Sequence, residues 1–100
     1  LPAVRTWGQL EAAGGSLYYV GGQSSTSTDE RSEVYYSSSF SGANPTWSTA
    51  TNGLPAARTQ FSASVWDDRI YVTGGLDSSA AAQTTVYVSP VGAFDPTIIL

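Results

Sequence analysis

The sequence predicts an all-β protein built from two consecutive units, each a meander of four short antiparallel strands. Residues 1–6 (LPAVRT) recur as residues 54–59 (LPAART), an offset of 53 residues, and such self-similarity is the signature of repeat architectures. Apolar residues alternate with polar ones in short bursts, which Gly, Asp, Asn, Pro and Ser separate. This pattern is typical of strands joined by turns. We therefore divide the chain into residues 1–53 and 54–100.

The alignment of the two units extends well beyond the first six residues. At the same offset Leu17-Tyr18 matches Ile70-Tyr71, and the double glycine after the second strand recurs without a gap. The offset then falls by one, so that Val34-Tyr35 matches Val86-Tyr87, and by one more, so that residues 45–47 match residues 96–98. Changes of length confined to loops are typical of repeat proteins.

The strands follow from this alignment, in chain order. We expect four strands in each unit, at residues 9–13, 17–20, 33–37 and 47–50, and at residues 60–66, 70–73, 85–89 and 98–100. The first two strands of each unit are joined by Gly14-Gly15 and by Asp67-Asp68. These residue types tolerate a positive φ, which the tight primed turn of a hairpin requires.

Several elements of each unit recur in a fixed order. A strand ending in Tyr-x-x-Gly-Gly is followed by a Val-Tyr strand, then by a Trp, and then by Leu-Pro-x-x-Arg at the next unit. Over essentially the whole chain this order resembles the Kelch motif. The resemblance implies that each unit is one four-stranded blade of a Kelch-type β-propeller, with its first strand lining a central channel. Ile98 stands where the first unit has Trp47, and two repeats are fewer than the four to eight blades of closed propellers.

The residues of the repeat signature have a structural interpretation and a functional one. The double glycines could cradle a phosphate, but no helix start or Lys follows them; we expect close backbone approach at Gly21, Gly22, Gly74 and Gly75. The aromatic residues could form a platform for stacking a carbohydrate, but we expect them to pack between blades. They are Tyr18, Tyr35, Trp47, Tyr71 and Tyr87.

The charged residues supply the candidate binding site. Arg5 and Arg58 follow the Leu-Pro signature and could bind an acidic ligand, although a structural role holding carbonyls or a carboxylate is favoured. A dense charge cluster around Arg31 is either a solvated loop or a contact for a partner or a cation. It includes Asp29, Glu30 and Glu33, and Asp77 lies in the corresponding loop of the second unit.

Topology predicts which loops act together. In an up-and-down meander the second-to-third-strand loops and the connection between units emerge on one face. That face gathers residues 23–32, 76–84 and 52–57. Long polar loops on a rigid scaffold are where binding usually occurs, so we place there the contact with a protein or carbohydrate ligand.

Composition excludes several classes of partner. The net charge is −4, with four basic residues and no His or Cys, so the chain lacks a basic surface for nucleic acid or for anionic lipid. The usual ligands of zinc, copper and haem are missing, and we expect no metal and no cofactor. No apolar run approaches the roughly 18 to 20 residues that cross a bilayer. We expect a soluble protein and predict no compartment.

Three functions are compatible with this pattern. The leading hypothesis is a non-catalytic binding or scaffolding module. The rival is a sugar-active enzyme, because Kelch-type propellers are similar to the scaffolds of a copper-dependent galactose oxidase and of a sialic acid mutarotase. The oxidase needs His and Cys, whereas a mutarotase-like role would use carboxylates and Arg, here Glu11, Arg5 and Arg58. A third possibility is an excised or engineered fragment without a ligand of its own, suggested by the start at Leu1-Pro2 and the lack of Met.

Two blades also predict an oligomer. A pair of blades leaves both outer faces bare, and repeat units do not bury such faces alone. Head-to-tail association covers these faces, and such contacts must close into a ring or they polymerise. We expect a homotrimer that forms a ring of six blades, with a tetramer of eight blades as the alternative.

Overall fold

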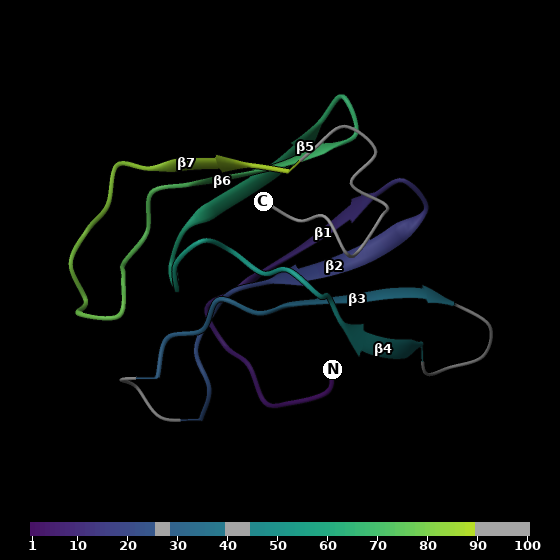
Figure 1. The fold of residues 1–100 in the computed structure, drawn as a ribbon, viewed down its shortest axis with the longest axis horizontal. Coiled ribbons are helices and arrows are strands. Elements are labelled where there is room, and N and C mark those ends of the chain that lie inside the picture. Colours follow the sequence, from purple (N-terminus) through teal and green to yellow (C-terminus); the bar gives the residue numbers. More distant parts are fainter. Residues whose placement is uncertain (26–28, 40–44, 90–100) are drawn as a thin grey trace.

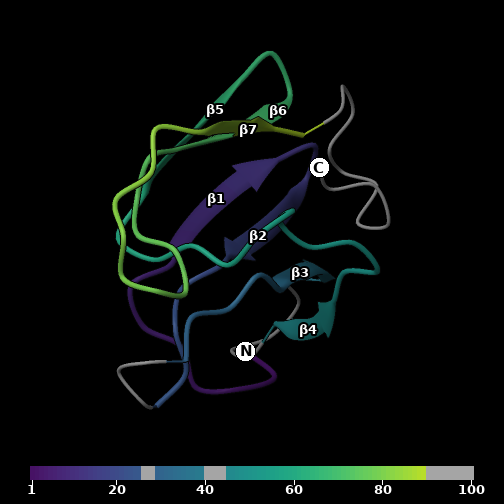
Figure 2. The same ribbon diagram turned by 60° about the vertical axis from the view of Figure 1, so that its left-hand side comes forward.

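A computed structural model of the chain describes residues 1–25, 29–39 and 45–89 and contains two antiparallel sheets (Figures 1 and 2). The first sheet has the strand order β1-β2-β3-β4, and the second has the order β5-β6-β7. Their bounds are β1 Gln9–Ala13, β2 Ser16–Val20, β3 Val34–Ser39, β4 Thr46–Thr49, β5 Ser62–Trp66, β6 Arg69–Thr73 and β7 Val86–Val88. Within the described residues there is no helix, so the predicted all-β class is confirmed. The strand expected at residues 98–100 lies outside them.

The expected strands form close to their predicted bounds. β1 matches its prediction, and β2 begins one residue earlier, at Ser16. β5 and β7 are shorter than expected, because Gln60 adopts a left-handed φ of 55° and Thr85 lies just before the ladder. No helix that could span a membrane is present in the part of the chain that the structure describes.

Each hairpin closes through a two-residue turn. Ala13 pairs with Ser16 across Gly14 and Gly15, whose φ values are 56° and 82°. In the second sheet, Trp66 pairs with Arg69 across Asp67 and Asp68, with φ values of 52° and 58°. Two consecutive positive φ values characterise the type I′ turn, whose twist matches that of the flanking strands. The predicted tight turns are therefore confirmed.

The core lies where the two sheets meet, with β1 beside β5 and β6 (Figures 1 and 2). The first sheet contributes Tyr18, Val20 and Val34, all almost fully buried, and the second contributes Ile70 and Val72. Alternation along each strand sends these side chains to one face. Full burial of one such aliphatic side chain is worth about 1.5–3 kcal/mol, so this junction holds the two sheets together.

The connection between the sheets completes this core. Leu54 is the first residue of the recurring Leu-Pro-x-x-Arg segment and Phe61 follows that segment, and both side chains are buried in the same cluster. Part of the linker is therefore packed into the interior of the protein, although it has no regular secondary structure.

The aromatic residues of the repeat signature occupy different environments. Tyr18 lies in the core, and Tyr87 packs against it. Tyr35 is buried on the opposite face of the first sheet. Trp47 and Tyr71 are half-buried, and strand alternation directs both away from the junction between the sheets. Only part of this set packs in the single junction that the structure contains.

The double glycine at the end of β2 and of β6 allows a close backbone approach. All four glycines have a positive φ, between 59° and 89°. A Cβ atom on Gly75 would lie 2.7 Å from the carbonyl oxygen of Thr59 and 2.8 Å from the Cβ of Phe61, whereas one on Gly74 would meet nothing closer than 3.6 Å. Both positions therefore require a positive φ, but only at Gly75 would a side chain also clash with neighbouring atoms.

This difference gives a matched pair of variants. We expect Gly75→Val to lower the free energy of unfolding by more than about 1 kcal/mol, since backbone strain and a clash act together. Gly74→Val should lower the free energy of unfolding by less, because it introduces backbone strain without a steric clash. Thermal and urea melts of both variants measure the difference, and equal losses at the two positions would contradict the steric reading of Gly75.

Candidate functional site

The long connections of the fold gather at one end of the two sheets. The β2–β3 loop and the β6–β7 loop both emerge at the left of Figure 1, and the β4–β5 linker runs back to the same end. The tight β1–β2 and β5–β6 turns lie at the opposite end. The predicted grouping of the long loops is therefore observed for the described residues, and we call this region the loop end.

Arg5 is buried at the loop end. Its side chain is 4% exposed. Nη2 donates to Oε1 of Glu33 at 3.0 Å and to the hydroxyl oxygen of Tyr35 at 2.6 Å, and Nη1 donates to the carbonyl oxygen of Val4 at 2.7 Å. The guanidinium carbon lies 5.1 Å from the centre of the Tyr35 ring, within the range of a cation–π contact. The charge of Arg5 thus faces the protein.

A row of alternating charges continues from Arg5 towards solvent. Arg31 donates from Nε and Nη2 to the two carboxylate oxygens of Glu33, each at 2.7 Å, and approaches Asp29 at 3.4 Å. We call Arg5, Glu33, Arg31 and Asp29 the Arg5 cluster. Hydrogen bonds from Arg31, followed by those from Arg5, hold the pKa of Glu33 below its usual value. The pKa of Asp29 is also lowered, first by a hydrogen bond from Ser24 and then by Arg31.

The second unit repeats this geometry with different partners. Arg58 is 4% exposed. It donates to the carbonyl oxygen of Ala57 at 2.8 Å, to Oγ1 of Thr85 at 3.0 Å and to the hydroxyl oxygen of Tyr87 at 3.2 Å. Its guanidinium carbon lies 5.4 Å from the Tyr87 ring centre. Thr85 occupies the place of Glu33, so the Arg–Tyr contact is preserved and the carboxylate is not.

Asp77 holds its own loop together. Its Oδ1 accepts hydrogen bonds from the backbone N–H groups of Ser79 at 2.8 Å and Ala81 at 3.0 Å, and its Oδ2 accepts one from the side chain of Gln83 at 2.7 Å. The N–H groups of Ala81 and Ser79 lower the pKa of Asp77. Both carboxylate oxygens are therefore engaged within the β6–β7 loop.

The remaining charges define what the loop end offers. Asp29 and Arg31 have side-chain exposures of 44% and 37%. Glu30 pairs with Gln23 in an isolated β-bridge and is half-buried, with its Oε2 buried and unbonded among the described residues. Of the Arg5 cluster, Asp29 and Arg31 are thus the most accessible side chains, followed by Glu33 with an exposure of 30%.

Within the described residues, no ion pair joins Glu11 to Arg5 or Arg58. Arg5 and Arg58 sit in separate clusters, each neutralised or hydrogen-bonded by its own unit. Glu11 lies on β1, and burial raises the pKa of its carboxyl. In residues 1–25, 29–39 and 45–89, no three His, Cys, Asp or Glu side chains gather as metal ligands.

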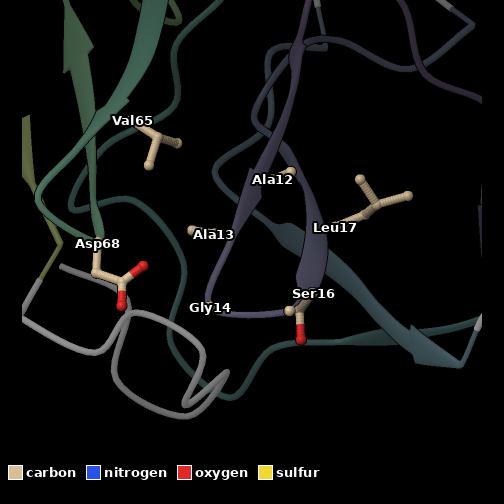
Figure 3. Close-up of a pocket in the computed structure, with 8 residues that line it drawn as sticks. Ala12, Ala13, Gly14, Ser16, Leu17, Val65 and Asp68 are labelled. Atoms are coloured by element: carbon tan, nitrogen blue, oxygen red, sulfur yellow. The ribbon is translucent and has the colours of Figure 1, made fainter.

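A cavity of about 500 Å³ lies at the opposite end, beside the two tight turns (Figure 3). Val65 and Asp68 of the second sheet line it on one side, and the β1–β2 hairpin, including Ala12, Ala13 and Leu17, lines the other. Among the described residues that line it, Asp68 carries the one charged side chain. Sequence reasoning predicted both turns but not the cavity, because nothing in a turn sequence reports how two neighbouring hairpins pack.

Comparison with known proteins adds nothing to these contacts: no protein-family model and no curated protein matches the chain.

The Arg5 cluster predicts a pH dependence of stability. The folded-state pKa of Glu33 lies below its ordinary value of 4.5, so the cluster stabilises the fold above that value. Its contribution falls as the pH drops through the folded-state pKa. Glu33→Gln should lower the melting temperature at pH 7, and the difference in melting temperature from the unmodified protein should narrow as the pH falls below 4.5. Melts over this pH range measure it, and a constant difference would contradict the assignment.

Proposed function

We propose that the chain is a non-catalytic scaffolding module, a pair of Kelch-type propeller blades that associates with copies of itself into a closed ring. The observation that carries the proposal is the contrast in exposure between equivalent positions of the two units. Some positions that are buried where the two sheets meet have equivalents that are exposed on the outward faces, and others, such as that of Tyr18, have equivalents that are half-buried.

The contrast holds on both sides of the junction. On the first-sheet side, Ala13 and Val34 are 6% and 0% exposed, whereas their second-unit equivalents Trp66 and Val86 are 70% and 57% exposed. On the second-sheet side, Leu54 is 6% exposed, and its first-unit equivalent Leu1 is 49% exposed. Each of these positions is thus apolar in both units, but its side chain is buried in only one of them.

Exposed apolar side chains favour an association that covers them. Trp66 and Val86 lie on the outward face of the second sheet, and Leu10 (55% exposed) lies on that of the first. Large exposed apolar patches on soluble proteins usually mark interaction sites. A second copy presents to each outward face the type of surface that already covers its equivalent inside the chain. Head-to-tail contacts of this kind form a ring when the rotation closes.

The size of the ring follows from blade number. Closed propellers have about four to eight blades, and a ring built only from this chain has two blades per copy. We favour the trimer of six blades, with the tetramer of eight as the alternative.

The loop end supplies the binding surface of this ring. The β2–β3 and β6–β7 loops of every copy would point to one side, which would repeat the accessible Asp29 and Arg31 around the ring. A polar surface that recurs in this way suits a protein or carbohydrate partner. A glycan array probed with the assembled ring tests the carbohydrate class, and the absence of any bound glycan would leave a protein surface as the remaining partner class.

Light scattering tests the assembly. The chain has a mass of 10.5 kDa, and we expect the mass of three chains at micromolar concentration, with a melting temperature that rises with protein concentration. A mass of one chain together with a cooperative melt independent of concentration would contradict the proposal.

A further inference from the structure

We infer that the junction between two copies repeats the junction inside the chain, group for group, with the second sheet of one copy packed on the first sheet of the next. This inference rests on the proposed function and adds the partner surface, its direction and its hydrogen bonds. We call the outward face of the second sheet the rear face, and that of the first sheet the front face. The rear face comprises Trp66, Arg69, Tyr71, Val86 and Val88, and the front face comprises Leu10, Ala12, Leu17 and Tyr19.

Backbone hydrogen bonds define the internal junction. Gly22 N–H donates to the carbonyl oxygen of Arg58 at 2.9 Å, and Arg58 N–H donates to the carbonyl oxygen of Arg31 at 3.3 Å. Gln60 N–H donates to the carbonyl oxygen of Trp7 at 3.1 Å. Each bond joins a group of the first unit to a group of the second, so each has an equivalent across a junction between copies.

The equivalent groups are available at the open ends. Replacing each partner by its equivalent one repeat further along gives three hydrogen bonds between copies. Gly75 N–H of one copy would donate to the carbonyl oxygen of Arg5 in the next copy. In that next copy, Arg5 N–H and Trp7 N–H would donate to the carbonyl oxygens of Gln83 and Gln60 of the first copy. Within the described residues, none of these N–H or carbonyl groups makes a backbone hydrogen bond. The open ends therefore carry unpaired donors and acceptors in the arrangement that the internal junction uses.

Trp7 and Gln60 add a second indication. They are equivalent in the repeat, and both have a left-handed φ, 65° and 55°, which is unusual for residues other than Gly. Within the described residues, the carbonyl oxygen of Trp7 accepts a backbone hydrogen bond and its N–H donates none, whereas the N–H of Gln60 donates one and its carbonyl oxygen accepts none. If Trp7 N–H of each copy donates to Gln60 of the preceding copy, these hydrogen bonds and the internal bonds from Gln60 to Trp7 form a continuous series around the ring.

Side-chain size supports the pairing of rear face with front face. Inside the chain, the cavity between the hairpins is lined by Ala13 and Ser16 from the first sheet and by Val65 and Asp68 from the second. At the junction between copies the equivalents of the first pair are the larger Trp66 and Arg69. The equivalents of the second pair are the smaller Ala12 and Gly15. One side of the junction between copies therefore has larger residues than inside the chain, and the other side has smaller ones. The Trp66 indole would fill the space between copies that corresponds to the cavity inside the chain.

Two variants test the direction of the contact. Leu10→Asp blocks the front face and Trp66→Asp blocks the rear face, and both residues are more than half exposed in the single chain, so the fold should tolerate either change. Each variant alone should have the mass of one chain. An equimolar mixture should form a complex of two chains that cannot grow, because one intact rear face meets one intact front face. Thr51→Asp, at an exposed linker position, is the control and should assemble like the unmodified chain.

The outcomes separate this inference from the proposed function. If the unmodified chain has the mass of one chain, the ring itself is wrong. If the unmodified chain assembles but one variant still forms homo-oligomers, the contact is a symmetric one between like faces. If the mixture stays at one chain, the contact lies elsewhere. Either of the last two results overturns the inference alone.

Amide hydrogen exchange tests the hydrogen bonds. In the assembled protein the amides of Arg5, Trp7 and Gly75 should exchange at least tenfold more slowly than in the single-chain Trp66→Asp variant. Gly22, Arg58 and Gln60 supply the matched amides, since they are bonded inside the chain and should be protected in both. Equal exchange of the first group in the two proteins would show that the junction has another register.

Discussion

The close passage of the linker beside the double glycine is the constraint on which the rest of the structure depends. A Cβ atom on Gly21 would lie 2.8 Å from the carbonyl oxygen of Arg58, and Gly22 donates its N–H to that same oxygen. Only residues without a side chain, in a positive-φ conformation, allow the two backbones to meet. This contact ties the start of the second unit to the end of β2, and Leu54 and Phe61 reach the core from either side of it.

The two buried arginines act through the same linker. Each follows a Leu-Pro pair and contacts a tyrosine of the third strand of its own unit, Tyr35 for Arg5 and Tyr87 for Arg58. The linker is thereby held to a strand that lies two strands away from the one it feeds. What varies between the units is the acceptor beside the tyrosine, a carboxylate in one and a hydroxyl in the other. The charge of the acceptor is thus variable, whereas the geometry of the Arg–Tyr contact is retained.

Much of the fold could be predicted because the same strand and turn pattern occurs twice in the sequence. The recurrence of residues 1–6 aligned the two units, and the turn residues between aligned strands located both hairpins. The environment of each signature aromatic could not be predicted in the same way. A repeat signature marks positions that pack between neighbouring units. In a pair of units, each such position lies at the junction in one unit and on an outward face in the other. Tyr18 is consequently buried, whereas its equivalent Tyr71 is half-buried on an outward face.

The candidate site was predicted less completely, for a related reason. Charge spacing located the cluster around Arg31, but it did not show that Arg5 would join this cluster through Glu33, 28 residues away in the sequence. Asp77 was indistinguishable by sequence from a ligand-binding carboxylate, and its capture by its own loop depends on the φ of 58° at Ala80. Contacts of this kind are set by local backbone conformation, which residue type alone does not specify.

The asymmetry between the two outward faces is the reason that the proposed association pairs unlike faces. A symmetric dimer through the rear faces would bring two Trp66 and two Arg69 side chains into one junction, which overfills it and places like charges together. A symmetric dimer through the front faces would oppose the small residues Ala12 and Gly15 and leave a gap. Only the unlike pairing matches large residues with small ones. A module whose two ends fit each other but not themselves grows in one direction, and such growth either ends in a ring or continues as a filament. In the proposed assembly, the twist between the two sheets of one chain would determine how many copies close a ring.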